Sequence, residues 1–115
     1  MLRALVRPPG DSFARAISAQ EPRPTIDPGM ARQQHAVYCA ALRQAGVEVL
    51  ELAADERYPD GCFVQDTAVI FEGLAVVARF GVESRQSEQQ AVRQALQGHK
   101  RLVEIRAPAT LEGGD

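Results

Sequence analysis

TAVIFEGLAVVARF, residues 67–80, contains the clearest pattern of secondary structure in the chain. Two apolar runs of β-forming residues flank Glu72-Gly73, and a glycine-containing dipeptide between such runs predicts a β-hairpin. Because this antiparallel pair lies in the middle of the chain, the segments on either side must supply the helices and the remaining strands.

The segment before the hairpin begins with a predicted strand and a loop. Residues 1–7 are apolar enough for a buried strand, which Pro8-Pro9-Gly10 ends. Residues 10–27 predict a long loop with one helical turn around residues 13–19. Long loops in compact domains often act as lids over a site.

The helix that follows this loop is the best-marked element of the chain. Asp27 is placed to cap it, Pro28 suits its first turn and Gly46 ends it. Residues 47–52 then predict a strand, and residues 53–61 predict an acidic loop. The predicted apolar face of the helix consists of Met30, Gln34, Val37, Tyr38, Ala41, Leu42 and Ala45.

The remaining segments predict a second helix-containing unit. Residues 62–64 suggest a short strand, residues 84–97 a helix capped by Ser84 or Ser87, and residues 101–105 a last strand. The order of elements suggests two related units of strand–strand–helix–strand type. The expected class is α/β, or α+β with mixed strand directions.

Composition limits the classes of function. With 115 residues, the chain has room for a single domain over residues 1–115. Thirteen basic against fifteen acidic residues give a net charge of −2 without a basic run, which argues against a nucleic-acid partner. No membrane-spanning or signal-peptide pattern is present, so we expect a cytoplasmic protein whose partner is a small molecule or another protein.

Four carboxylates gather in a short segment. Asp55 and Glu56 open the acidic loop, and Asp60 and Asp66 flank residues 62–64. If that run is extended, Asp66 lies at the edge of a sheet, where a half-buried carboxylate needs a cation. A planar guanidinium satisfies it best, because two parallel N–H groups match two carboxylate oxygens. The alternative is a solvated acidic loop in which Asp66 caps a turn.

The cysteines and histidines predict neither a hydrolytic triad nor a metal site. Cys39 and Cys62 are expected to be thiols rather than a disulfide, and Cys62 is expected to pack in the core. His35 and His99 have no Cys, Asp or Glu at metal-ligand spacing, so both are expected at the surface or near helix ends. No cofactor is indicated.

Two further charged residues invite a functional interpretation. Glu112 precedes Gly113-Gly114, where the backbone can approach another segment closely, a setting that suits a group orienting a catalytic residue. A polar residue in a turn is the alternative. Arg85, near the start of the second helix, is expected to face solvent, although its poor position for the helix dipole mildly favours an external anion.

Four segments together resemble the dimethylarginine dimethylaminohydrolases of the guanidino-group-modifying superfamily, which includes arginine deiminases and amidinotransferases. They are DERYPD (55–60), FVQD (63–66), RFGVESR (79–85) and LEGGD (111–115), in the order and spacing of that family. The resemblance runs nearly end to end. It implies a pentein fold, a five-bladed α/β propeller with helices packed outside, of which this chain would form roughly the first two blades.

The resemblance also implies roles for individual residues. Asp66 would bind the substrate guanidinium, Asp60 would lie in the pocket near the amino-acid end, and Arg85 would pair with the α-carboxylate. The backbone carbonyl of Ile17, on the long loop, would help to hold the α-amino group. Glu112 would orient the catalytic histidine.

Gln65 departs from the family pattern, because the family commonly has glutamate at this position. The change removes one negative charge beside the expected guanidinium site, so Gln65 bears on substrate affinity and on substrate identity.

The reaction implied by the resemblance converts an Nω-methylated arginine to citrulline and methylamine or dimethylamine. A cysteine thiolate near the C-terminus of the family attacks the guanidinium carbon, and a histidine protonates the leaving amine and activates water. His35, His99, Cys39 and Cys62 all lie in other segments. We therefore expect an N-terminal part of such an enzyme, without the catalytic His and Cys and inactive alone.

Two alternatives remain open. In place of the methylarginine hydrolase, the chain would be a non-catalytic protein that binds arginine analogues or assembles with a partner, or it would be part of an arginine deiminase or amidinotransferase. In each case we expect exposed sheet edges to favour self-association or pairing with a C-terminal half.

Overall fold

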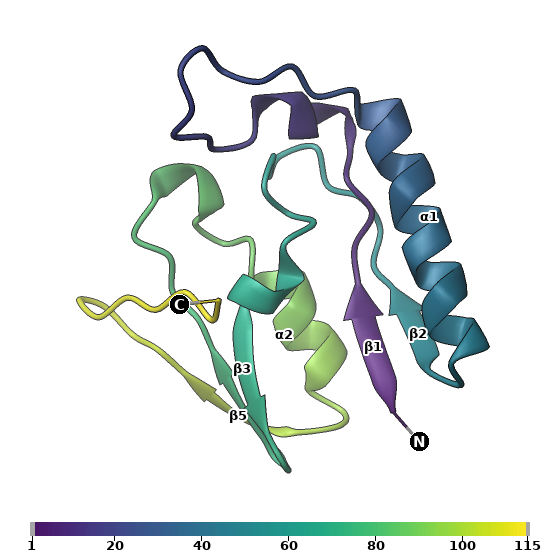
Figure 1. Cartoon of the computed structure of the whole chain (residues 1–115). Helices are drawn as coiled ribbons and strands as arrows, with labels where there is room; N and C mark the ends of the chain where they lie inside the picture. The colour runs from purple at the N-terminus through teal and green to yellow at the C-terminus, as the bar shows by residue number, and fades with distance from the viewer. Residues whose placement is uncertain (1, 115) are drawn as a thin grey trace. The chain divides into compact units, whose positions relative to one another are not determined.

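A computed structural model describes residues 2–114. They form two compact units, of which the first ends at Cys62 and the second begins at Phe63. In each unit a helix connects two parallel strands (Figure 1). The combination of helices with strands of mixed direction confirms the predicted α/β class. Within these residues, no helix has the length and apolar character needed to cross a bilayer.

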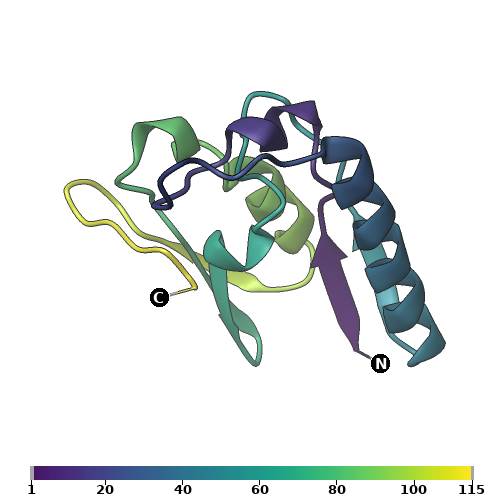
Figure 2. The same cartoon turned by 45° about the horizontal axis from the view of Figure 1, so that its top comes forward.

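The first unit is a strand–helix–strand unit. β1 (Arg3–Val6) and β2 (Glu48–Glu51) pair in parallel, and α1 (Pro28–Gln44) lies beside them in both views (Figures 1 and 2). Asp27 caps α1 as predicted, since its carboxylate accepts the N–H of Met30 at 3.1 Å. Between β1 and α1 runs the predicted long loop, whose helical turn is a short 3-10 helix, Asp11–Arg15.

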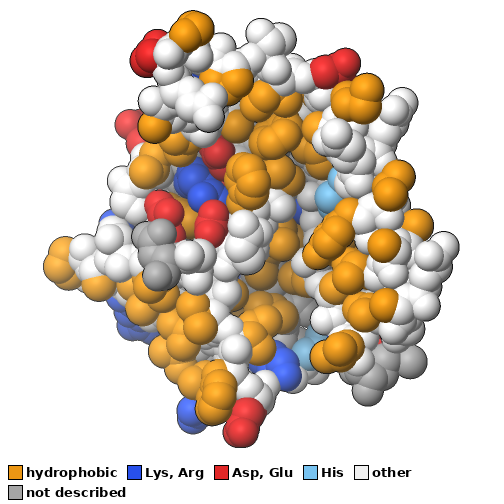
Figure 3. Space-filling model, in the orientation of Figure 1, with side chains coloured by type: hydrophobic (Ala, Val, Ile, Leu, Met, Phe, Trp, Pro, Cys, Tyr) orange, Lys and Arg blue, Asp and Glu red, His pale blue; other side chains and the backbone are white. Residues whose placement is uncertain are grey.

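The predicted apolar face of α1 is wrong. Met30, Val37 and Tyr38 are 51%, 71% and 56% exposed, and Figure 3 shows hydrophobic side chains on the surface over α1. The buried residue of the helix is Cys39, one turn after the half-buried His35. Apolar periodicity selected the wrong side because the inward stripe is built on small and polar side chains.

The second unit is a three-stranded mixed sheet with one helix. β3 (Ala68–Phe71) and β4 (Leu74–Val77) form the predicted antiparallel hairpin, and β5 (Arg101–Glu104) pairs with β4 in parallel. α2 (Gln90–Leu96) makes the crossover from β4 to β5 and lies beside the sheet in both views (Figures 1 and 2). The buried core of this unit comprises Ala75, Val77, Ala78, Phe80, Val92 and Leu96.

Two predicted elements of this unit are wrong. Residues 62–64 are not a strand, because the chain turns there into a 3-10 helix, Val64–Asp66, closed by Thr67, whose N–H and hydroxyl both bond to the carbonyl of Val64. The second helix begins at Gln90 rather than Ser84, without a side-chain cap. Ser87 has φ of 72°, which is incompatible with a continuous α-helix through this segment.

Candidate functional site

The acidic loop of the first unit is anchored by Glu56. Its carboxylate accepts the backbone N–H groups of Asp11 at 3.0 Å and of Ser12 at 2.8 Å, which are the unsatisfied donors at the start of a 3-10 helix. These hydrogen bonds hold the pKa of Glu56 below its ordinary value, with the bond from Ser12 contributing most. A Cβ at Gly10 would collide with this carboxylate, so the contact also explains that glycine.

Asp60 and Ile17, two predicted pocket residues, are brought together in the first unit. The two carboxylate oxygens of Asp60 lie 3.2 and 3.3 Å from the backbone nitrogen of Ile17, which donates to them. Asp60 is 5% exposed, whereas the Ile17 side chain is exposed. The buried carboxylate therefore fixes the long loop at the residue whose carbonyl was predicted to face a substrate.

Asp55 binds within its own loop. Its carboxylate oxygens accept from Nε and Nη2 of Arg57 at 3.0 and 2.7 Å, and this hydrogen-bonded pair is the main reason that the pKa of Asp55 is lowered. The interpretation of all four acids as a solvated loop is therefore wrong, because Asp55 and Glu56 organise the loop and Asp60 is buried.

The second unit contains a buried ionic cluster centred on Arg85. Its Nε and Nη2 bind both oxygens of Glu88 at 2.9 and 2.5 Å, and its Nη1 binds Asp66 at 2.9 Å. Nη2 also lies 3.5 Å from the carbonyl oxygen of Phe63, and the guanidinium carbon is 4.4 Å from the centroid of the Phe80 ring. This arrangement combines a bidentate ion pair, a second carboxylate and a cation–π contact.

The sequence-based expectation that Arg85 faces solvent is wrong, since Arg85 is 5% exposed. Sequence reasoning also missed Glu88, which is 1% exposed, and Phe80. The spacing of Arg85 and Glu88, three positions apart, was the available signal, because such pairs lie next to each other on one turn of helix.

The cluster has more negative than positive charge. Asp66 and Glu88 each carry −1 and Arg85 carries +1, which leaves −1 over the three groups. Burial alone would lower the pKa of Arg85, but the hydrogen bonds to Glu88 and Asp66 outweigh it and raise that pKa, so the guanidinium stays charged. One negative charge beside a partly exposed Asp66 favours a cation from solution.

The two glycines near the end of the chain pass closely along Asp66. The N–H of Gly113 donates to the carbonyl of Asp66 at 2.8 Å, and a Cβ at Gly113 would lie 2.6 Å from the carbonyl oxygen of Gln65. A Cβ at Gly114 would collide with the Asp66 carboxylate. The close approach expected from the glycines is therefore present, and it holds Glu112 next to the Asp66 segment.

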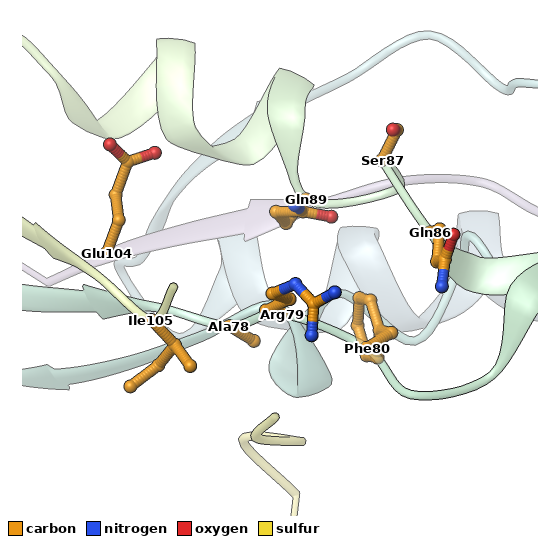
Figure 4. Close-up of a pocket in the computed structure, with 8 residues that line it drawn as sticks. All are labelled: Ala78, Arg79, Phe80, Gln86, Ser87, Gln89, Glu104 and Ile105. Carbon is orange, nitrogen blue, oxygen red and sulfur yellow. The ribbon is translucent and has the colours of Figure 1, made fainter. Parts of the chain in front are cut away.

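Described residues of the second unit line two cavities. One, of about 280 Å³, is lined by Glu112 together with Gly81, Thr110 and Leu111. The other, of about 220 Å³, is lined mainly by polar side chains, among them Gln89 and Glu104 (Figure 4). Phe80 lines this second cavity and also stacks with Arg85, so the two features share one wall.

The predictions about the cysteines and histidines are only partly confirmed. Neither Cys39 nor Cys62 forms a disulfide, as expected. Burial, and next the negative Glu51, raise the pKa of the Cys39 thiol, which disfavours the thiolate that a nucleophile needs. The expectation that His35 has no Cys or Glu at metal-ligand spacing is wrong, because His35, Cys39 and Glu51 lie together.

The sequence of the chain is similar to those of dimethylarginine dimethylaminohydrolases. The profile of the family described as N,N dimethylarginine dimethylhydrolase, eukaryotic, matches residues 10–114. N(G),N(G)-dimethylarginine dimethylaminohydrolase of Streptomyces coelicolor is 36% identical over 114 residues, which are 98% of this chain and 44% of that protein.

Solved structures agree with the sequence matches. A dimethylarginine dimethylaminohydrolase variant in an adduct with S-methyl-L-thiocitrulline superposes with a TM-score of 0.94 at 30% identity, over 99% of this chain and 45% of that one. A mutant of the Pseudomonas aeruginosa enzyme complexed with citrulline gives a TM-score of 0.93 at the same identity and coverage. The chain thus spans less than half the length of the relatives it matches.

Proposed function

This chain belongs to the dimethylarginine dimethylaminohydrolase family, and from that membership we propose that it provides the substrate-binding part of an enzyme that converts Nω-methylated arginine to citrulline and an alkylamine. The enzyme would be a hydrolase acting on the bond between the guanidinium carbon and the methylated nitrogen. Relatives in crystal structures hold citrulline or S-methyl-L-thiocitrulline, which agrees with a substrate of this shape.

The cluster of Asp66, Arg85 and Glu88 is the observation that carries this proposal. Its summed charge of −1, from two carboxylates and one guanidinium, attracts a cation. Asp66 is its accessible acid, with 17% of its side chain exposed against none for Glu88. A substrate guanidinium would therefore bind at Asp66, where a carboxylate oxygen can accept its N–H groups.

The remaining roles follow from the placement of each side chain. Arg85 would pair with the substrate α-carboxylate through Nη2, whose contact with the Phe63 carbonyl, at 3.5 Å, is long for a hydrogen bond and easy to exchange. Asp60 would position the loop at Ile17, so that the carbonyl of Ile17 can accept from the α-amino group.

Catalysis would also need a cysteine and a histidine. We place these two groups in the segments of the relatives that this chain does not match. There a cysteine thiolate would attack the guanidinium carbon, and a histidine would protonate the departing amine and then deprotonate the water that releases citrulline. Glu112, held beside Asp66 by the Gly113 backbone, would accept a hydrogen bond from that histidine and orient its ring. The chain alone would bind substrate without turning it over.

We further propose that the two compact units are two blades of a pentein propeller, forming one N-terminal domain. Each contains a helix between parallel strands, which supports a repeated architecture. The apolar residues Val69, Ile70, Phe71 and Val103 are exposed on the second unit's sheet, which supports pairing with a C-terminal half.

Gln65 favours a second candidate within the same superfamily, an arginine deiminase. Its side chain is exposed beside Asp66 and is neutral, so one charge that the family commonly provides is absent there. Arginine and dimethylarginine carry the same positive charge, so Gln65 would select between them through the shape and hydrogen-bonding groups of the pocket wall, with the same binding residues.

Citrulline release by the full-length protein separates these candidates. We expect turnover of Nω,Nω-dimethylarginine, with arginine as the poorer substrate. Turnover of arginine with dimethylarginine untouched would support the deiminase. Absence of turnover for both, combined with calorimetric binding of dimethylarginine that Asp66→Ala removes, would leave a non-catalytic binding protein.

A further inference from the structure

The first unit contains a second cluster of polar side chains, which the proposed function does not use. His35, Cys39 and Glu51 each offer one ligand atom, and these atoms all lie within 4.8 Å of one another. Nitrogen, sulfur and carboxylate oxygen are the three donor types found in protein zinc sites. We propose that His35, Cys39 and Glu51 bind Zn²⁺, in a site that clips α1 to β2.

Local structure brings the three residues together. His35 and Cys39 are four positions apart on α1, so their side chains lie one above the other on the same face of the helix. Glu51 is the last residue of β2, the strand beside which α1 packs. A ligand pair on one helix turn and a third ligand from the adjoining strand is a rigid frame, since neither backbone needs to move.

The sulfur–nitrogen distances are close to those around a tetrahedral ion, and rotation of the His35 side chain would point one ring nitrogen at that ion. Sγ of Cys39 lies 3.7 Å from Nδ1 of His35 and 3.9 Å from Nε2. With bonds of about 2.3 Å to sulfur and about 2.0 Å to nitrogen, tetrahedral zinc holds these two atoms about 3.5 Å apart. The carboxylate of Glu51 is 46% exposed and can adjust by rotating its side chain.

Charge also fits a divalent cation. When Zn²⁺ binds, the Cys39 thiol loses its proton to solvent, and the resulting thiolate and the Glu51 carboxylate balance the two positive charges. Arg43 competes for Glu51, since its Nη2 lies 3.5 Å from Oε2. Both partners of that pair are about half exposed, so the pair is weak and a metal ion can replace it.

The proposed site has three protein ligands in a half-buried position, whereas structural zinc sites usually have four. Water would take the fourth coordination position, because Glu51 opens the cluster to solvent. The ion would link the helix to the strand and so stabilise the first unit.

Titration of the reduced protein with Co²⁺ tests the proposal directly, since a cobalt–thiolate bond gives a near-ultraviolet charge-transfer band that reports on sulfur ligation. The chain has two cysteines and two histidines, so it supplies its own controls. We expect the band in wild type, Cys62→Ser and His99→Gln. Cys39→Ser should abolish it, and His35→Gln and Glu51→Gln should weaken binding by at least about tenfold, because even outer partners of metal ligands have effects of that size.

A second measurement guards against a folding failure of Cys39→Ser at its buried position. Zn²⁺ should raise the Tm of wild type and of Cys62→Ser, and should raise it less in Glu51→Gln, whose exposed side chain is not needed for packing. Arg43→Gln, which removes the competing cation, should bind Co²⁺ more tightly than wild type. Absence of a band in wild type, or a band that depends on Cys62 instead of Cys39, would overturn the proposal.

Discussion

Asp60 in the first unit and Asp66 in the second come from the same acidic segment, but they differ in burial and hold different groups. Asp60 is buried and accepts a neutral backbone N–H from Ile17. Asp66 is partly exposed and accepts from the charged guanidinium of Arg85 at 2.9 Å. The first carboxylate holds a loop, whereas the second belongs to a cluster with surplus negative charge.

The difference shows that the residue type alone does not define the role of an acid. A carboxylate that accepts a backbone N–H needs an oxygen in the right position, and an amide oxygen provides one. A carboxylate in an ion pair also contributes its negative charge, which an amide of the same shape lacks. Substitutions that change shape and charge separately can therefore distinguish the two carboxylates.

Arg85→Met should have the largest effect on stability. The substitution leaves the buried Glu88 without its cation and beside a second acid, Asp66. Breaking a buried ion pair lowers the unfolding free energy by about 3–5 kcal/mol. Urea denaturation followed by circular dichroism measures the loss. Arg57→Ala, which removes an exposed guanidinium from Asp55, is the matched control and should leave the midpoint nearly unchanged. Equal midpoints for the two variants would refute the distinction between buried and surface pairs.

Asp66→Asn and Asp60→Asn compare the two carboxylates directly. Asp66→Asn keeps an oxygen that accepts from Arg85 but removes the charge of that acceptor, so it should lose up to about 1.5–3 kcal/mol, the value of a charge-assisted hydrogen bond. Asp60→Asn keeps an oxygen that accepts from Ile17, so its unfolding free energy should fall by less than about 1 kcal/mol. Urea denaturation measures both unfolding free energies. A larger loss of unfolding free energy in Asp60→Asn than in Asp66→Asn would contradict the roles assigned to the two carboxylates.

Gly113→Ala tests the close passage of the backbone along Asp66. The added Cβ would meet the carbonyl oxygens of Gln65 and Ala68 at 2.6 and 3.0 Å, and overpacking of this kind costs about 1–3 kcal/mol. Gly98→Ala is the control, since a Cβ there meets nothing within 4 Å. If both variants unfold at the same urea concentration, the contact does not hold Glu112 in place.

The smallest effect concerns pH and belongs to the loop of the first unit. Because hydrogen bonds from Ser12 and Asp11 lower the pKa of Glu56 in the folded state, Glu56 stabilises the fold above its unfolded pKa. That contribution is lost as the pH falls through the lower folded pKa. Glu56→Gln should therefore show a shallower loss of stability between neutral and acidic pH. Parallel stability curves for wild type and variant would contradict this role.

Much of the fold could be predicted because several elements are set by residues close together in the sequence. Asp27 caps α1 with its own side chain, and Glu72-Gly73 turns the hairpin between β3 and β4. These interactions depend on neighbours in sequence, so propensity and spacing suffice. The prediction of a strand at residues 62–64 is wrong because the Thr67 hydroxyl donates to the carbonyl of Val64 and closes a turn. The apolar pattern of the sequence does not reveal that this turn competes with a strand.

The ionic cluster could not be predicted because it depends on burial. Arg85 has the sequence context of a surface residue, and it enters the interior only because Glu88 and Asp66 neutralise it there. Family motifs identified Asp66 and Arg85, but not Glu88, which lies outside the matching segments. In the same way, the neighbourhood of His35 depends on the packing of α1 against β2, which brings in Glu51.

The central claim is that the negative charge of Asp66 receives the substrate guanidinium, and its most direct test is the kcat/KM for dimethylarginine of the full-length protein carrying Asp66→Asn. The substitution keeps the shape of the side chain and removes its charge. We predict a loss of at least about thirtyfold, since losing one partner of a buried charged pair costs about 2 kcal/mol or more, while Asp60→Asn loses much less. An Asp66→Asn protein that is folded and as active as wild type would contradict the account.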